Sequence, residues 1–97
     1  MAKAELAHHS KLIYPDGTIR EMIIWRLPRQ SRERSHGLKY RLYYGTADGK
    51  CFVRYDNETG KGDHKHINDK EEAYQFETVE KLIEDFQKDI DRFRRAG

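Results

Sequence analysis

Apolar and polar residues in the first third of the chain predict two β-strands joined by a tight turn. Residues 8–14 form the first strand, and Pro-Asp-Gly at 15–17 supplies residues that favour a chain reversal. Residues 18–27 form the second, with imperfect alternation, because Met22 and Ile24 fall on the side that also carries two arginines. We therefore expect both sides of this strand to be partly covered, or Met22 and Ile24 to meet a partner.

Two further segments show the period of two that marks a strand with one buried side. Residues 38–44 have Leu or Tyr at every second position, and in residues 51–56 the side chains of Cys51, Val53 and Tyr55 share one side. The intervening GTADGK is rich in turn-forming residues. Because connections this short favour sequential neighbours in space, we predict a four-stranded antiparallel meander with strand order 1-2-3-4.

The C-terminal segment has the period of an α-helix. Apolar residues recur at intervals of three and four, at Val79, Leu82, Ile83, Phe86, Ile90 and Phe93. Thr78 is placed to cap this helix, and its early glutamates and late arginines suit the helix dipole. Packing the apolar stripe on one face of the sheet buries both surfaces. We therefore predict an α+β fold, forming one domain over residues 1–97.

The face of the predicted sheet that the helix leaves open is expected to be basic. Residues 1–54 hold eleven Lys and Arg against five Asp and Glu, whereas residues 55–97 hold eight against twelve. This asymmetry favours a polyanionic partner such as RNA, although a folded chain can also interleave the two charge types. The candidate RNA-binding residues on this face are Arg20, Arg26, Lys39, Arg41 and Arg54.

Composition excludes several classes of protein. The single cysteine, Cys51, rules out an internal disulfide framework and a zinc site built from several cysteines. No stretch approaches the roughly 20 apolar residues of a membrane-spanning helix, and the N-terminus lacks the apolar core of a signal peptide. We therefore expect a soluble, cytoplasmic protein.

The run YDNETGKGDHKH, residues 55–66, concentrates the groups best suited to chemistry. Glycines flank Lys61, and in an extended segment His64 and His66 point to the same side. Metal-independent cleavage of RNA needs one imidazole to take a proton, a second to return one, and a cation to stabilise the charged phosphate. We therefore predict an endoribonuclease without cofactor or metal, whose catalytic residues are Lys61, Asp63, His64 and His66, assisted by Tyr55 and Asp56.

Other interpretations of the same run stay open. His64 and His66, with a carboxylate from Asp56 or Asp63, have the ligand types of a Zn²⁺, Mn²⁺ or Fe²⁺ site, although a neighbouring lysine disfavours a cation. The run can also be a solvated turn. The protein can then be a non-catalytic module that binds RNA or protein through its arginines, or an enzyme that transfers a nucleotidyl group.

Four segments of the chain resemble the TumE family of toxins from prokaryotic toxin–antitoxin systems. They are YDNETGKGDHKH, the upstream HSKLIYPDGTIREMIIWRLP, the intervening HGLKYRLYYG and the C-terminal FETVEKLIEDFQKDIDRFR. The most specific part is the Gly-Lys-Gly-Asp-His-x-His signature at residues 60–66. The resemblance implies growth inhibition through RNA and neutralisation by a helix-turn-helix antitoxin. A bare edge at the first strand and exposed Met22 and Ile24 would favour that complex, and also a homodimer.

Overall fold

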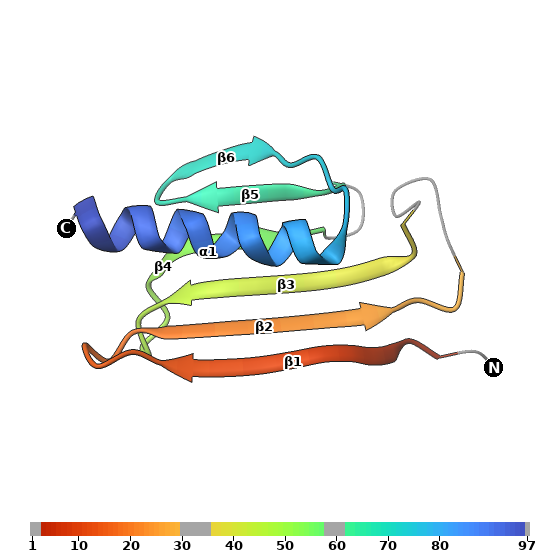
Figure 1. Ribbon diagram of the computed structural model, residues 1–97, viewed down its shortest axis with the longest axis horizontal. Helices are drawn as coiled ribbons and strands as arrows, with labels where there is room; N and C mark the ends of the chain where they lie inside the picture. Colours follow the sequence, from red (N-terminus) through yellow and green to blue (C-terminus); the bar gives the residue numbers. More distant parts are fainter. Residues whose placement is uncertain (1–2, 30–35, 58–61, 97) are drawn as a thin grey trace.

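Six antiparallel strands form one sheet in sequence order within residues 3–29, 36–57 and 62–96, which are the residues described by the computed structural model (Figure 1). A single helix, α1, follows the last strand. The strands are β1 (Glu5–Ile13), β2 (Ile19–Arg26), β3 (Leu38–Gly45), β4 (Cys51–Asp56), β5 (His64–Ile67) and β6 (Lys70–Ala73), and α1 spans Val79–Ala96.

The expected meander and the C-terminal helix are confirmed, but the prediction of only four strands was wrong. The run after β4 continues the sheet as the hairpin β5–β6. These strands are four residues each and mostly polar, so they carry no hydrophobic alternation to detect. Asn68 turns the hairpin with a φ of 55°, a left-handed conformation that Asn tolerates.

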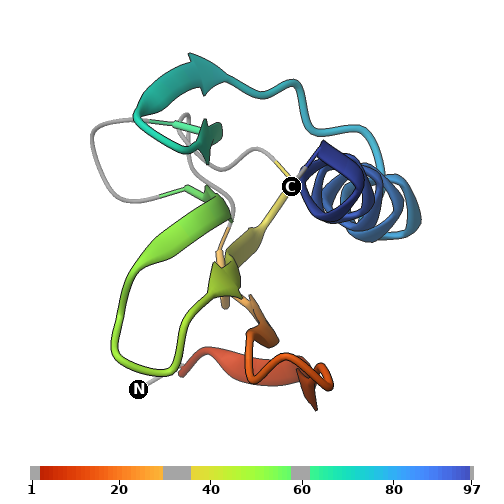
Figure 2. The ribbon, with the colours of Figure 1, turned by 90° about the vertical axis from the view of Figure 1, so that its left-hand side faces the viewer.

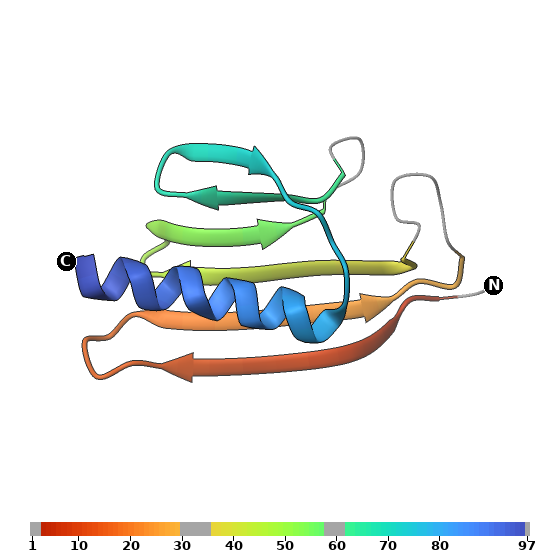
Figure 3. The same ribbon diagram turned by 45° about the horizontal axis from the view of Figure 1, so that its top comes forward.

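Helix α1 covers one face of the sheet and leaves the other open (Figures 2 and 3). Met22 of β2, Leu42 of β3 and Tyr55 of β4 are paired in register and so lie on the same face. Leu82 and Phe86 of α1 pack on that face, in a core whose side chains are at most 5% exposed. The core contains Met22, Ile24, Tyr40, Leu42, Tyr44, Val53, Tyr55, Leu82, Phe86 and Ile90.

The side chains of β2 correct two expectations, that Met22 and Ile24 are exposed and that Arg20 and Arg26 lie on the open face. Neither Met22 nor Ile24 is exposed, so neither offers a surface to a partner. Arg20 and Arg26 share their side of β2 and therefore lie on the helix face, where Arg20 Nη1 donates a hydrogen bond of 2.7 Å to Gln87 Oε1. Of the five basic residues expected on the open face, three lie there: Lys39, Arg41 and Arg54.

Polar contacts join α1 to the sheet. Thr78 caps the helix as predicted, since its hydroxyl accepts a hydrogen bond of 3.0 Å from the Lys81 amide. The buried carboxylate of Asp89 accepts a hydrogen bond from the Tyr55 hydroxyl and lies 3.4 Å from Lys65 Nζ. No helix among the described residues has the length and apolarity needed to cross a membrane.

Shortening the side chain of Phe86, near the centre of α1, should sharply destabilise the fold. Phe86 is fully buried, so Phe86→Ala removes its contacts and opens a cavity that costs about 3–5 kcal/mol. Chemical denaturation would measure the loss. Lys88→Ala, an exposed change on the same helix, is the matched control and should stay within about 0.5 kcal/mol of the parent. Equal effects of the two changes would contradict this packing.

Alkaline pH should weaken the contact between Tyr55 and α1. Burial, together with the hydrogen bond to Asp89 and its charge, raises the pKa of the Tyr55 phenol. A group whose pKa is higher in the folded state contributes stability that is present below its unfolded pKa and is lost as pH rises. Unfolded tyrosine titrates at about 10, so the free energy of unfolding should fall above about pH 10, and fall less steeply for Tyr55→Phe. Denaturation at a series of pH values would test this, and identical slopes would refute it.

Candidate functional site

The open face of the sheet brings together side chains from β3, β4 and β5. Asp56 is paired with both Arg41 and His64, and Arg54 is paired with His66. Directly opposed residues of antiparallel strands point to the same face, so these five side chains form one group. Helix α1 lies on the other face of the sheet (Figure 2).

His64 is the most constrained member of this group. Its side chain is 5% exposed, and its Nδ1 lies 3.1 Å from the carbonyl oxygen of Gly62. A carbonyl can only accept, so Nδ1 carries the proton that it donates. Gly62 adopts a φ of 69°, the left-handed conformation that glycine accommodates at no steric cost. The other nitrogen, Nε2, lies 2.5 Å from Asp56 Oδ1.

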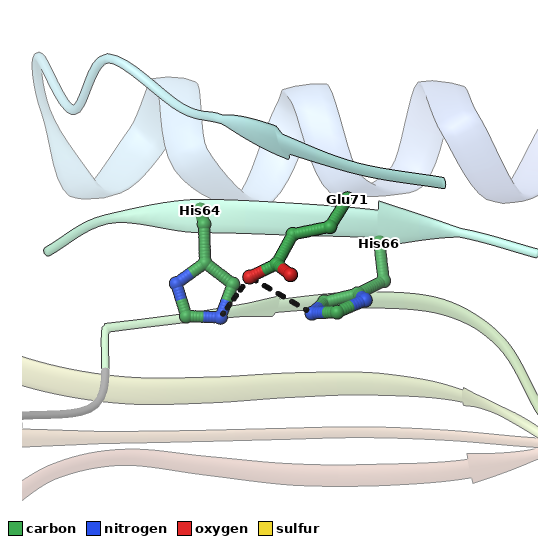
Figure 4. Close-up of side chains that lie close together, drawn as sticks. All are labelled: His64, His66 and Glu71. Carbon is green, nitrogen blue, oxygen red and sulfur yellow. Dashed lines mark ion pairs between the residues drawn. The ribbon is translucent and has the colours of Figure 1, made fainter. Parts of the chain in front are cut away.

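His66 and Glu71 complete the cluster. The two imidazole rings are 5.3 Å apart between centroids, and Glu71 reaches them from β6, where it is paired with His66. Glu71 Oε1 lies 3.6 Å from Nε2 of each histidine (Figure 4). The three ligand atoms all lie within 4.8 Å of one another. We call His64, His66, Glu71 and Asp56 the imidazole–carboxylate cluster.

Several buried atoms of this site have no hydrogen bond of acceptable geometry within the described part of the chain. They are Nε2 of His64, Nε2 of His66, Oδ1 of Asp56 and Nε of Arg54, although Arg54 Nε lies 3.0 Å from Asp56 Oδ2 as an ion pair. A buried polar atom without a hydrogen bond costs about 1–3 kcal/mol. Such atoms are uncommon in folded proteins, and a group of them on one face marks a place where a ligand can bind.

Not every residue expected in the site lies there. The Asp63 carboxylate lies 2.9 Å from His36 Nε2, and the His36 ring in turn packs 4.1 Å from Phe76 between centroids. Tyr55 is in the core under α1. Lys61 lies outside the described residues. Of the six predicted catalytic residues, the structure therefore brings Asp56, His64 and His66 together.

Sequence reasoning missed Glu71 because it did not recognise the β5–β6 hairpin. A two-residue turn at Asn68 and Asp69 reverses the chain and places Glu71 opposite His66. Reading residues 64–73 as a hairpin would have indicated this pair. Asn57, which follows Asp56, has a structural role: its side chain accepts a hydrogen bond from the Tyr40 amide and donates one to the Leu38 carbonyl.

A pocket of about 360 Å³ lies on the same open face, beside the cluster. Its walls are mixed: Ile19, Ile23 and Tyr43 are apolar or aromatic, and Arg41 supplies a cation. Arg41 joins the pocket to the cluster, because it is also the β3 partner of Asp56. The remaining lining residues are Lys11, Glu21, Thr46, Ala47 and Gly49.

Comparison with models of protein families identifies a family for this chain. A family model described as Toxin TumE matches residues 3–94, nearly the whole chain. No curated protein and no solved structure matches the chain significantly.

The pairing of Asp63 with His36 predicts a structural role for both residues. The two side chains are 11% and 15% exposed and tie the start of β5 to the segment before β3. We expect Asp63→Asn to lower the free energy of unfolding by about 1–3 kcal/mol, because the hydrogen bonds of a buried charged group are lost. A double-mutant cycle with His36→Ala should show coupling between the two changes. Additive effects, measured by denaturation, would contradict this pairing.

Proposed function

Because this chain belongs to the TumE family of toxins, we propose that it inhibits growth by cleaving RNA phosphodiester bonds at the imidazole–carboxylate cluster. Membership of a toxin family implies an antitoxin partner. The proposal of RNA cleavage rests on one observation. Two imidazoles and two carboxylates converge beside Arg54 on the open face of the sheet.

Phosphodiester cleavage needs groups that this face supplies. A proton must leave the attacking oxygen, the departing oxygen must gain one, and the charge that builds on the phosphate must be stabilised. Imidazoles suit the proton transfers because their pKa lies near neutrality. Arg54 is 28% exposed at the edge of the cluster, which allows its guanidinium to meet a phosphate oxygen.

The basic residues and the pocket support RNA as the substrate. Lys39, Arg41 and Arg54 lie on the open face, where they can contact successive phosphates of a backbone. The neighbouring pocket offers Tyr43 for stacking on an unpaired base and apolar walls from Ile19 and Ile23. We propose that a nucleoside next to the cleaved bond occupies this pocket.

The two histidines differ in access to a substrate. The His66 side chain is 22% exposed, whereas that of His64 is 5% exposed and directs Nε2 at Asp56. In a metal-independent reaction, His66 would therefore meet the RNA and His64 would act through its neighbours. The metal-independent reaction expected from the sequence stays a prediction.

The edge strand β1 offers a docking surface for the antitoxin. Leu6, Leu12 and Ile13 are 60%, 41% and 64% exposed, and the outer edge of β1 is unpaired by any described strand. An open strand edge with exposed apolar side chains is a surface that association would protect. We propose that a helix-turn-helix antitoxin covers β1, in place of the surface expected at Met22 and Ile24.

Incubation of purified protein with labelled structured and unstructured RNA tests the proposed activity. His66→Ala should lower the cleavage rate by about 10²–10⁴, the usual contribution of one proton-transfer group. His9→Ala is the matched control, because His9 also lies on the open face and its Nε2 is 3.0 Å from a carboxylate oxygen of Glu21. The control should retain the parent rate.

Growth assays separate cleavage from binding. If RNA is uncut, or if a His64→Ala/His66→Ala double variant stays toxic while Arg41→Ala does not, the protein is a non-catalytic binding inhibitor and the proposed activity is wrong. A strict requirement for a nucleoside triphosphate would indicate nucleotidyl transfer instead. Addition of EDTA to the cleavage reaction decides whether the reaction needs a metal ion.

A further inference from the structure

We propose that His64, His66 and Glu71 bind one divalent transition-metal ion. This inference goes beyond the proposed function, because binding of the ion does not require that RNA be the substrate. It rests on the ring proton at His64 Nδ1, on the buried cluster atoms that lack a hydrogen bond of acceptable geometry within the described residues, and on the spacing of the ligand atoms.

The first argument concerns the lone pair of His64 Nε2. Because Nδ1 donates its proton to the Gly62 carbonyl, the neutral form of the ring carries its lone pair on Nε2, the atom that lies 3.6 Å from Glu71 Oε1. Metal-binding histidines typically donate their other ring N–H to a backbone carbonyl or carboxylate. His64 has this arrangement.

The second argument is that the cluster lacks internal hydrogen bonds. Within the described residues, Nε2 of His64, Nε2 of His66 and Oδ1 of Asp56 are buried atoms without a hydrogen bond of acceptable geometry. His64 is 4% exposed as a residue, and Asp56 3%. A shared proton could satisfy one pair of these atoms. A metal ion would engage both Nε2 atoms together, because each supplies a lone pair in the neutral ring.

The third argument is geometric. Ligand nitrogens and oxygens lie about 2.0–2.2 Å from a transition metal, which places them about 3–3.5 Å from each other in a tetrahedral site. Glu71 Oε1 is 3.6 Å from both Nε2 atoms. Since the Glu71 side chain is 45% exposed, its carboxylate can rotate by the small amount needed. The two histidines come from one strand, and their Nε2 atoms lie within 4.8 Å of each other, so the rings must turn toward each other to meet one ion.

The donor set indicates which ions the site would accept. Two imidazoles with a carboxylate and no thiolate suit Zn²⁺, Mn²⁺, Fe²⁺, Co²⁺ or Ni²⁺, whereas Mg²⁺ and Ca²⁺ prefer oxygen ligands alone. The Glu71 side chain is 45% exposed, so solvent reaches that side of the cluster and a position on the ion would be available to water or to a phosphate oxygen. An ion there would serve as a Lewis acid in place of imidazole proton transfer.

Titration of metal-free protein with Zn²⁺ tests this site directly. Protein prepared without a polyhistidine tag, stripped with EDTA and freed of the chelator, should bind one Zn²⁺ per chain by calorimetry. Co²⁺ should bind the same site and give visible absorption bands. His66→Ala and Glu71→Gln should each weaken the binding at least about tenfold, since even loss of a second-shell group costs 10–100-fold.

Two controls keep the result interpretable. His9→Ala should bind as tightly as the parent, because it removes an imidazole beside a carboxylate elsewhere on the same face. Circular dichroism should show that Glu71→Gln, which changes an exposed side chain, stays folded. Zn²⁺ should raise the melting temperature of the parent but not that of this variant.

The proposal is overturned if no saturable binding occurs, or if both site variants bind like the parent. All titrations are made without RNA. Failure of RNA cleavage would therefore leave the metal site standing, and failure of metal binding would leave metal-independent cleavage standing.

Discussion

The pairing of β4 with β5 is the constraint on which the rest of the structure depends. Its register sets Asp56 opposite His64 and Arg54 opposite His66. A slip of one residue would turn both imidazoles toward α1 and send Lys65 to the open face. Contacts on the helix face oppose that slip: Lys65 Nζ lies 3.4 Å from buried Asp89 and 5.7 Å from the centre of the Tyr55 ring. The packing of the helix therefore helps to position a site on the opposite side of the sheet.

The two faces of the sheet differ in the side chains that they carry. Under α1, apolar side chains fill the core and the buried Asp89 is hydrogen-bonded to Tyr55. On the open face, buried atoms of His64, His66 and Asp56 lack hydrogen bonds within the described chain, which reduces the stability of the free protein. Natural proteins depart from complete hydrogen bonding chiefly at functional sites. Among the described residues, four such atoms gather at Asp56, His64, His66 and Arg54, which supports the proposed site there, whereas His8, Arg20 and Tyr40 carry three more on the helix face.

The residues around the cluster hold it from several directions. Gly62 orients His64 through its carbonyl, and Asn57 joins the end of β4 to β3. Asp63, expected among the catalytic residues, pairs instead with His36 at the start of β5. The described residues at 62–66 thus include side chains that face the cluster and residues that support it. A run of conspicuous polar residues need not act as one chemical group, because alternate side chains of a strand point to opposite faces.

The sequence by itself determined the elements whose patterns are strong. The period of two in β3 and β4 and the period of three to four in α1 predicted those elements well, and extended geometry alone placed His64 and His66 on one side. Only the tertiary structure decided which face of the sheet α1 covers. That choice buried Met22 and Ile24 and carried Arg20 and Arg26 to the helix face. Only the tertiary structure brought Glu71 to the histidines, because β5 and β6 are short, polar strands that form by pairing with β4 rather than by a pattern of their own.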